Sequence, residues 1–307
     1  MDVLVKTGGI MNRSIRLIVA LLAFTASGRA AQNNAGQLVG PPRPPVEQPV
    51  PPEIREVRVI APNLYEVRGP RPLEGAANLL QRKLGVPVSV EEPPWVSSSD
   101  VTLAEDFAEE PRSSRREARN FLVPRGGTFD LVIEASDRGP GASETIRRAL
   151  SQYMARNNPG EFELLDLGEQ GFSIAPRRIK NATGTLVEIP RLLDMRISFP
   201  EQRRSLDETL GLFREALSRV SGLPVIDVSA GGSNYLRMVA VTAGASNERA
   251  RDVLARVLRI PGEMKASWRV RYDPQDHGYG ITLSWIQREI VGADGRPRLE
   301  PVAWPLN

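Results

Sequence analysis

The sequence predicts an α+β protein made of two similar small modules that follow one another along the chain. Three observations lead to this prediction. Apolar residues at helical spacing alternate with short apolar strands, the same order of elements occurs twice, and an apolar and a proline-rich segment precede both copies. A chain of 307 residues is long enough for two ordinary domains. Each copy is expected to have the element order β-α-β-β-α-β-β.

Residues 11–31 have the layout of a secretory signal peptide. Arg13 and Arg16 precede ten mainly apolar residues, and small residues follow as far as Ala31, where cleavage is expected. The apolar stretch is too short to span a bilayer comfortably. We therefore assign residues 1–31 to a signal peptide and expect a periplasmic or secreted protein of the bacterial envelope. The membrane would be contacted only through this segment, if it stays uncleaved.

Residues 32–52 are expected to form a linker. Seven prolines lie within residues 40–52, and this composition favours extended polyproline geometry over a packed core. A ligand for a proline-recognition domain is the alternative, but a spacer between the signal peptide and the folded part is favoured. The folded region is expected to begin near Glu53.

Charge and composition exclude several classes of function. Residues 1–31 hold four of the 40 basic residues and one of the 37 acidic residues, which leaves 36 of each in the remaining chain. A neutral chain lacks the basic surface expected of a nucleic-acid-binding protein. The absence of cysteine excludes disulfides, thiolate nucleophiles and thiolate metal sites, and a single histidine excludes histidine-based metal clusters. We expect no metal and no cofactor, although calcium bound by carboxylates alone stays open.

The repeat assigns the first module to residues 53–180 and the second to residues 181–307. Residues 60–68 and 189–196 open the two copies and match in residue type at an offset of 128. A helix follows in each copy, marked by apolar residues that recur every three or four positions. These residues are Leu73, Ala77, Leu80 and Leu84 in the first copy and Leu206, Leu210, Phe213, Leu217 and Val220 in the second.

The ends of these two helices are also marked in the sequence. Ser205 and Glu208 have the spacing of a capping box at the start of the second-copy helix. Gly85 and Gly222 stand where a left-handed residue ends a helix. One residue after each glycine, a Pro-Val pair leads into a short apolar strand.

The remaining parts of the two copies match as well. Strands are expected at residues 129–135 and 235–242, and the glycine-led segments 141–143 and 244–246 precede a second helix. The apolar positions of these helices are Ile146, Leu150 and Tyr153 in one copy and Ala250, Leu254 and Val257 in the other. The closing strands are expected at 162–167 and 172–175 in the first copy and at 268–272 and 279–285 in the second.

The copies differ by an insert at residues 92–128, between the second and third strands of the first copy. It contains four acidic residues followed by four arginines: Glu105, Asp106, Glu109, Glu110, Arg112, Arg115, Arg116 and Arg119. A solvated helical excursion with local ion pairs is the favoured interpretation. A contact loop specific to this copy is the alternative, because long insertions often carry function.

The segment 205–228, together with the helix at 244–258, resembles the secretin and TonB short N-terminal domain. The resemblance rests on the spacing of the apolar residues and on the Gly-Leu-Pro sequence that ends the helix. It covers residues 55–178 and 185–290. Members of this family are small periplasmic modules with two helices and strands in this order. The resemblance implies an interaction module without catalytic residues to transfer.

Few residues in the sequence suggest a catalytic site. His277, with Asp273 or Asp276, could act as an acid/base pair, but turn composition accounts for all three residues. The carboxylate pairs Glu161/Glu163 and Glu66/Asp194 have the residue types of a glycosidase site. No phosphate-binding loop and no nucleophile elbow is present in the sequence.

Two hypotheses for the function follow. The first is an exported, non-catalytic adaptor that binds an envelope protein, with no assigned catalytic, cofactor or metal residue. The second is an envelope hydrolase, directed at glycan, that uses a carboxylate pair. The absence of a phosphate-binding loop and a nucleophile elbow from the sequence favours the first hypothesis, so we expect that the protein is not an enzyme.

The C-terminal residues predict a β-hairpin. Asp294 and Gly295 form a two-residue turn signal, which would pair Ile290 with Leu299 and Trp285 with Trp304. In this arrangement the missing N–H groups of the prolines lie on the outer edge, where no strand needs them. These prolines are Pro297, Pro301 and Pro305.

Overall fold

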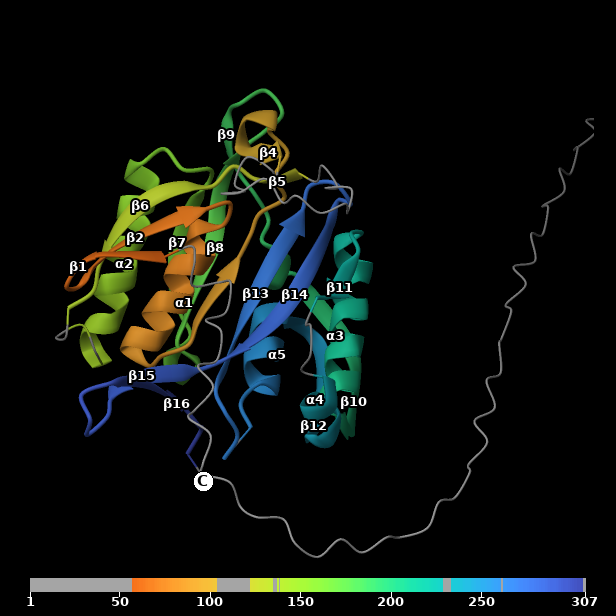
Figure 1. Ribbon diagram of the computed structural model, residues 1–307. Coiled ribbons are helices and arrows are strands. Elements are labelled where there is room, and N and C mark those ends of the chain that lie inside the picture. The colour runs from red at the N-terminus through yellow and green to blue at the C-terminus, as the bar shows by residue number, and fades with distance from the viewer. Residues whose placement is uncertain are drawn as a thin grey trace, which may run out of the picture. The chain divides into compact units, whose positions relative to one another are not determined.

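The computed structural model of the protein shows a mixed α+β architecture (Figure 1). It describes residues 57–103, 122–134, 137, 139–228, 233–260 and 262–305, all of which belong to one compact unit. Within these residues there are five α-helices and several β-sheets. The expected signal peptide at 1–31 and linker at 32–52 lie outside the described residues.

The first half of the described chain contains two helices in contact with two sheets. Helix α1 (Pro72–Leu84) contacts strands β2, β6 and β3, and helix α2 (Ala142–Ala155) contacts β6 and β7. One sheet has the order β1-β2-β6, from β1 (Val57–Ala61), β2 (Leu64–Gly69) and β6 (Gly127–Val132). The other strands are β3 (Val88–Glu91), β7 (Glu161–Asp166) and β8 (Phe172–Lys180).

The second half contains a comparable series of elements, without counterparts of β1 and of residues 101–124 and with an added short helix, α4 (Ser233–Met238). Helix α3 (Leu206–Ser221) contacts β10 and β11, and helix α5 (Ala250–Val257) contacts β12. Strands β10 (Arg196–Ser205) and β12 (Ala240–Arg249) form an antiparallel pair. The remaining strands are β11 (Val225–Asp227), β13 (Ala266–Asp273) and β14 (Gly278–Trp285).

A seven-stranded sheet joins the two halves. Its order is β11-β14-β13-β3-β8-β7, with β9 (Leu186–Glu188) paired to the end of β8. In each half, the strand after the first helix is parallel to the last strand (β3 to β8, β11 to β14), which is antiparallel to the strand before it. Strand β13 of the second half pairs in parallel with β3 of the first, where Val270 is opposite Glu91. The two halves therefore share one continuous sheet.

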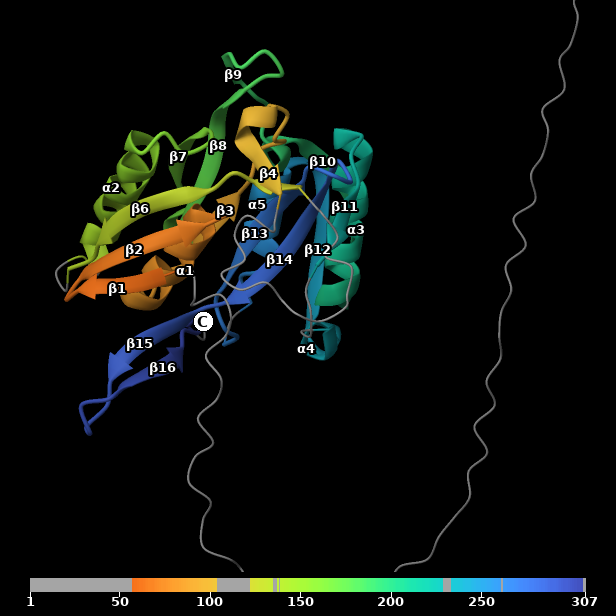
Figure 2. The same ribbon diagram turned by 45° about the horizontal axis from the view of Figure 1, so that its top comes forward.

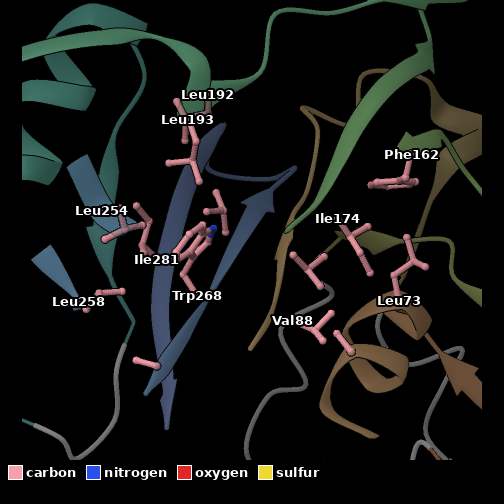
Figure 3. Close-up of a cluster of buried hydrophobic side chains, with 14 of the residues drawn as sticks. Leu73, Val88, Phe162, Ile174, Leu192, Leu193, Leu254, Leu258, Trp268 and Ile281 are labelled. Atoms are coloured by element: carbon pink, nitrogen blue, oxygen red, sulfur yellow. The ribbon is translucent and has the colours of Figure 1, made fainter. Parts of the chain in front are cut away.

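The helices of the two halves cover opposite faces of this sheet. Alternate residues of a strand point to opposite faces, and Arg269 of β13 reaches Asn78 of α1 while its neighbour Trp268 packs near Leu254 of α5 (Figure 3). The two halves are joined head to tail, with β13 of the second half beside β3 of the first. Because this join reverses the direction of the corresponding strands, it also exchanges the face of the sheet that the helices cover. One hydrophobic cluster nevertheless runs through both halves.

The helix predictions are largely confirmed. The four apolar positions of α1 are buried, Gly85 has φ 72°, and Gly222 has φ 71°. The capping box is present, with the Ser205 hydroxyl accepting from the Glu208 N–H and the Glu208 carboxylate accepting from the Ser205 N–H. Val220, in the last turn of α3, is 47% exposed and lies outside the core cluster.

We expect Ser205→Ala to lower the free energy of unfolding by about 1 kcal/mol, because it leaves an N–H of the first turn of α3 without its acceptor. The measurement is urea denaturation followed by circular dichroism. Ser143→Ala in the first turn of α2 is the matched control, since α2 has no side-chain cap. An equal loss in both variants would contradict this role of Ser205.

The prediction of a strand at residues 235–242 is wrong for residues 235–238. Residues Ser233–Met238 form the short helix α4, and β12 begins at Ala240. Residues 235–238 contain leucine, arginine and methionine, which favour helix, and no β-branched residue.

The segment 244–246 does not precede the second helix as a turn, because it lies inside β12. Gly244 stands where the register of β10 and β12 shifts. A Cβ at this position would lie 2.4 Å from the Glu201 Cα. The glycine therefore permits close approach of two strands.

The opening segments of the two copies also occupy different elements. Leu64 and Glu66 lie in β2, whereas Leu192 and Asp194 lie in a 3₁₀ turn that precedes β10. The offset of 128 thus matches residue types without matching structure at this point. Leu192 is buried by packing against the core, which a turn residue does as well as a strand residue.

The C-terminal hairpin is present, in a register one residue from the prediction. Strands β15 (Gln287–Val291) and β16 (Pro297–Pro301) pair Ile290 with Arg298 instead of Leu299. The turn causes the shift. Gly295, at φ 75°, donates to the Gly292 carbonyl at 2.9 Å and forms a three-residue loop with a left-handed glycine.

The expected pairing of the two tryptophans is wrong, whereas the placement of the prolines on the outer edge is confirmed. Trp285 pairs with Ala266, and the Trp304 N–H donates to the Glu263 carbonyl. The Val302 N–H donates to Ile286 at 3.0 Å, so even-numbered residues face β15. Pro297 and Pro301 therefore lie on the outer edge, and Pro305 lies beyond the hairpin.

Candidate functional site

Two consecutive glutamates stand at the join between the two halves. Glu91 ends β3 and Glu92 follows it, and both side chains are buried. Successive residues point to opposite faces of the sheet. Glu91 therefore faces the second-half helices, and Glu92 faces the first-half helices.

Glu91 is the centre of a buried ion-pair network. Arg251 of α5 donates to Glu91 Oε2 at 2.7 Å, and the Leu193 N–H donates to Oε1 at 3.0 Å. The same guanidinium donates to Asp194 at 3.1 Å and to the Ser173 hydroxyl at 2.9 Å. Only 1% of Glu91 and 3% of Arg251 are exposed. The network ties α5 to two strands of the first half.

Glu92 has partners from both halves. Arg71 donates to Glu92 Oε1 at 2.8 Å, and the Tyr272 N–H donates to Oε2 at 2.9 Å. Close by, Glu74 of α1 forms a bidentate ion pair with Arg271 of β13, with one N–O distance of 2.8 Å. These contacts join the two halves on the face of the sheet that α1 covers, opposite the face with the Glu91 network.

The pKa values of these carboxyl groups shift in different directions. Burial raises the pKa of Glu91, and the charge of Arg251 opposes it only in part. Burial also raises the pKa of Glu92, against the charge of Arg71. For Glu74, burial acts upward as well, but the hydrogen bond and charge of Arg271 outweigh it and leave the pKa below its ordinary value.

A pocket lies beside Glu92. Its volume is about 410 Å³ with the open mouth included. Aromatic rings, prolines and charged groups line it, among them Trp95, Tyr153, Phe162, Pro70, Pro124, Arg71 and Arg125. The Trp95 indole N–H is buried without a hydrogen-bond partner, and the Tyr153 hydroxyl donates to the Pro159 carbonyl. The pocket suits a small, partly apolar group.

The pocket holds a carboxyl pair, Glu74 and Glu92, with opposite pKa shifts. Such a difference is typical of acid/base pairs in enzymes. Here, however, every oxygen of the two groups already accepts a hydrogen bond from arginine or from the backbone. The arrangement is therefore that of structural ion pairs.

The structure places His277 in the turn between β13 and β14, where it is exposed with φ 49°. Its Nδ1 lies 3.2 Å from the Tyr272 hydroxyl. Asp273 accepts from the N–H groups of Gln275 and Asp276 and so stabilises the turn. The turn interpretation is confirmed.

The proposed carboxylate pairs are not assembled into a site. Glu161 pairs with Arg178, and Glu163 pairs with Arg191. Glu66 lies in β2 opposite Asp130, whereas Asp194 belongs to the Glu91 network. Glu161 and Glu163 thus each have their own arginine partner, and Glu66 and Asp194 belong to different elements.

Of the insert at 92–128, the two ends are described. They form a two-stranded ribbon of β4 (Val101–Leu103) and β5 (Leu122–Pro124), which leads back to the pocket through Arg125. The acidic and basic residues at 105–119 lie outside the described residues.

Sequence reasoning missed Glu91 and Arg251, and it placed Glu92 only as the first residue of the insert. The available signal was a pair of acidic residues directly after an apolar strand, at 91 and 92. Their partner Arg251 lies 160 residues further along the chain, and only the fold brings it to Glu91.

No group of three or more histidine or acidic side chains in the described ranges is arranged to hold a metal ion. Among the helices of the same ranges, each is too short or too polar to cross a membrane. Comparison with protein-family models, curated proteins and solved structures found no match for the chain.

Proposed function

We propose that the protein is an exported, non-catalytic adaptor of the bacterial envelope, built from two repeats similar to the secretin and TonB short N-terminal domain. The observation that carries the proposal is the order β-α-β-β-α-β-β, which both halves contain among further elements, together with the like pairing of β3, β8 and β7 and of β11, β14 and β13. A duplicated module explains this agreement with a single evolutionary step.

The buried charges support a binding protein over an enzyme. The carboxylates at the join of the halves are held by arginines and backbone N–H groups, which fix the two modules relative to each other. Two halves that are held together in this way can present the surfaces of both to protein partners. The hydrolase remains the second candidate, because the pocket does contain Glu74 and Glu92 with opposite pKa shifts.

Export is tested by N-terminal sequencing of the native protein from an envelope fraction. The mature chain is expected to begin after Ala30 or Ala31. A native protein that keeps residues 11–30 would contradict cleavage.

The two candidate functions are separated by one pair of assays. An adaptor is expected to capture the same envelope protein at a fixed stoichiometry with wild-type and Glu92→Gln baits, and to release no soluble sugar from purified envelope glycan. A hydrolase is expected to release sugar fragments, and Glu92→Gln would abolish that release. Glu163→Gln is the matched control, since this carboxylate lies on β7 outside the pocket.

A further inference from the structure

Strand β1 is an edge strand of the described part of the chain with exposed apolar side chains. Strand β1 ends the sheet β1-β2-β6, as Figure 2 shows. Its side chains Val59 and Ile60 are 67% and 48% exposed. An exposed apolar edge strand is a template for pairing with another strand.

Three other edges, those of β16, β11 and β7, carry groups that hinder pairing. The edge of β16 is blocked by Pro297 and Pro301. Strand β11 has three residues, and the Val225 N–H already donates to the Ser218 hydroxyl at 2.9 Å. Strand β7 presents acidic residues at both ends. Because β7 and β11 are the edges that would continue the head-to-tail join, their protection prevents open-ended assembly.

Strand β1 has neither a proline nor an acidic residue. Val57 and Val59 lie opposite Val67 and Tyr65 of β2, whose side chains are buried against the core. Opposite residues of paired strands share a face, so the row of apolar side chains continues to Val59 and stops there. A further strand beside β1 would extend this row.

We propose that β1 pairs with β1 of a second copy of this chain, in an antiparallel register centred on Val59. In this register Val57 lies opposite Ala61, Val59 opposite Val59, and Arg58 opposite Ile60. All five residues of β1 take part, and no like charges meet. A register centred on Arg58 would place two arginines opposite each other, which is unfavourable.

The pairing would create one sheet of six strands across a two-fold axis. Such an interface is closed, because each β1 edge is used once. It therefore gives a dimer rather than a filament. The inference does not depend on the adaptor function: a monomeric protein would overturn it and leave that proposal unchanged.

The first test is sedimentation or light scattering of the purified protein from micromolar to millimolar concentration. A concentration-dependent dimer is expected. Val59→Lys should weaken it by about tenfold, since two lysines then meet at the centre of the register. Val291→Lys is the matched control, because Val291 is also a strongly exposed valine, 73% exposed, but belongs to β15 instead of β1.

A mixture of Val59→Lys and Val59→Asp is the second test, and it should restore association as a heterodimer through opposite charges. The chain contains no cysteine, so single cysteines report directly on proximity. Val59→Cys is expected to form a disulfide-linked dimer on mild oxidation, and Val291→Cys is not. A monomer at every concentration, a dimer unaffected by Val59→Lys, or equal cross-linking of both cysteine variants would overturn the proposal.

Discussion

Replacing Arg251 with methionine is expected to lower the free energy of unfolding by about 3–5 kcal/mol, the range for breaking a buried ion pair by removing one partner. The substitution leaves Glu91 buried with the Leu193 N–H as its remaining partner at 3.0 Å. Asp194 loses less, because it is partly exposed and keeps Arg191 at 3.2 Å. Urea denaturation at neutral pH measures the loss.

The loss in Arg251→Met should depend on pH. Burial already raises the pKa of Glu91, and removal of the arginine raises it further. A carboxyl group whose folded pKa is raised destabilises the fold as pH rises above its unfolded value of about 4.3. The stability difference between Arg251→Met and wild type is therefore expected to be smallest below that pH and to grow toward neutrality. A difference that is constant with pH would contradict an ionised Glu91 as its cause.

Adding Glu91→Gln to Arg251→Met should recover more than half of the loss. The amide carries no charge, and its carbonyl oxygen still accepts from the Leu193 N–H. Replacing both partners of a buried pair is much less harmful than removing one. Arg256→Met on the same helix is the matched control, since this side chain is half-exposed and should contribute no more than about 1 kcal/mol.

Trp268→Ala is expected to lower the free energy of unfolding by about 3–5 kcal/mol through loss of buried surface and the cavity left behind. The side chain is 1% exposed and lies between the sheet and α5, near Leu254 and Ile281 (Figure 3). Its backbone N–H donates to the Ser89 hydroxyl of the first half at 3.2 Å. The residue therefore lies where the two halves meet.

Thermal unfolding of Trp268→Ala should remain a single transition at a lower midpoint, because one core cluster spans both halves. Calorimetry is the measurement. Two separate transitions would show that the halves unfold independently, against the shared core. Leu299→Ala, on the exposed hairpin, is the control and should change the stability by less than about 0.5 kcal/mol.

The helices could be predicted from the sequence because their signals are local. The apolar stripe from Leu73 to Leu84 and the capping box at Ser205 each lie within a few turns of one helix. The left-handed glycines at the helix ends depend on the backbone of a single residue. Such features form wherever the segment folds as a helix.

The hairpin shows where a local signal is incomplete. Arg296 is the first paired residue of the returning strand in both the predicted and the observed register. The odd-numbered prolines therefore lie on the outer edge in either case. Asp294 and Gly295 suit two loop types, a two-residue and a three-residue one. The choice between them shifts every pair by one residue, and the contact of Trp304 with Leu258 accompanies the observed choice.

The amino-acid sequence by itself determined the helices α1, α2, α3 and α5, the capping box of α3, the glycines that end α1 and α3, and the position of the outer prolines. Only the tertiary structure decided that β13 joins β3, that the helix pairs cover opposite faces, and that Glu91 meets Arg251. The physical reason is the separation along the chain between the residues that interact. Helical periodicity and turn chemistry depend on neighbours in the chain, whereas a strand edge or a buried charge is stabilised by a partner that only the complete fold brings within reach.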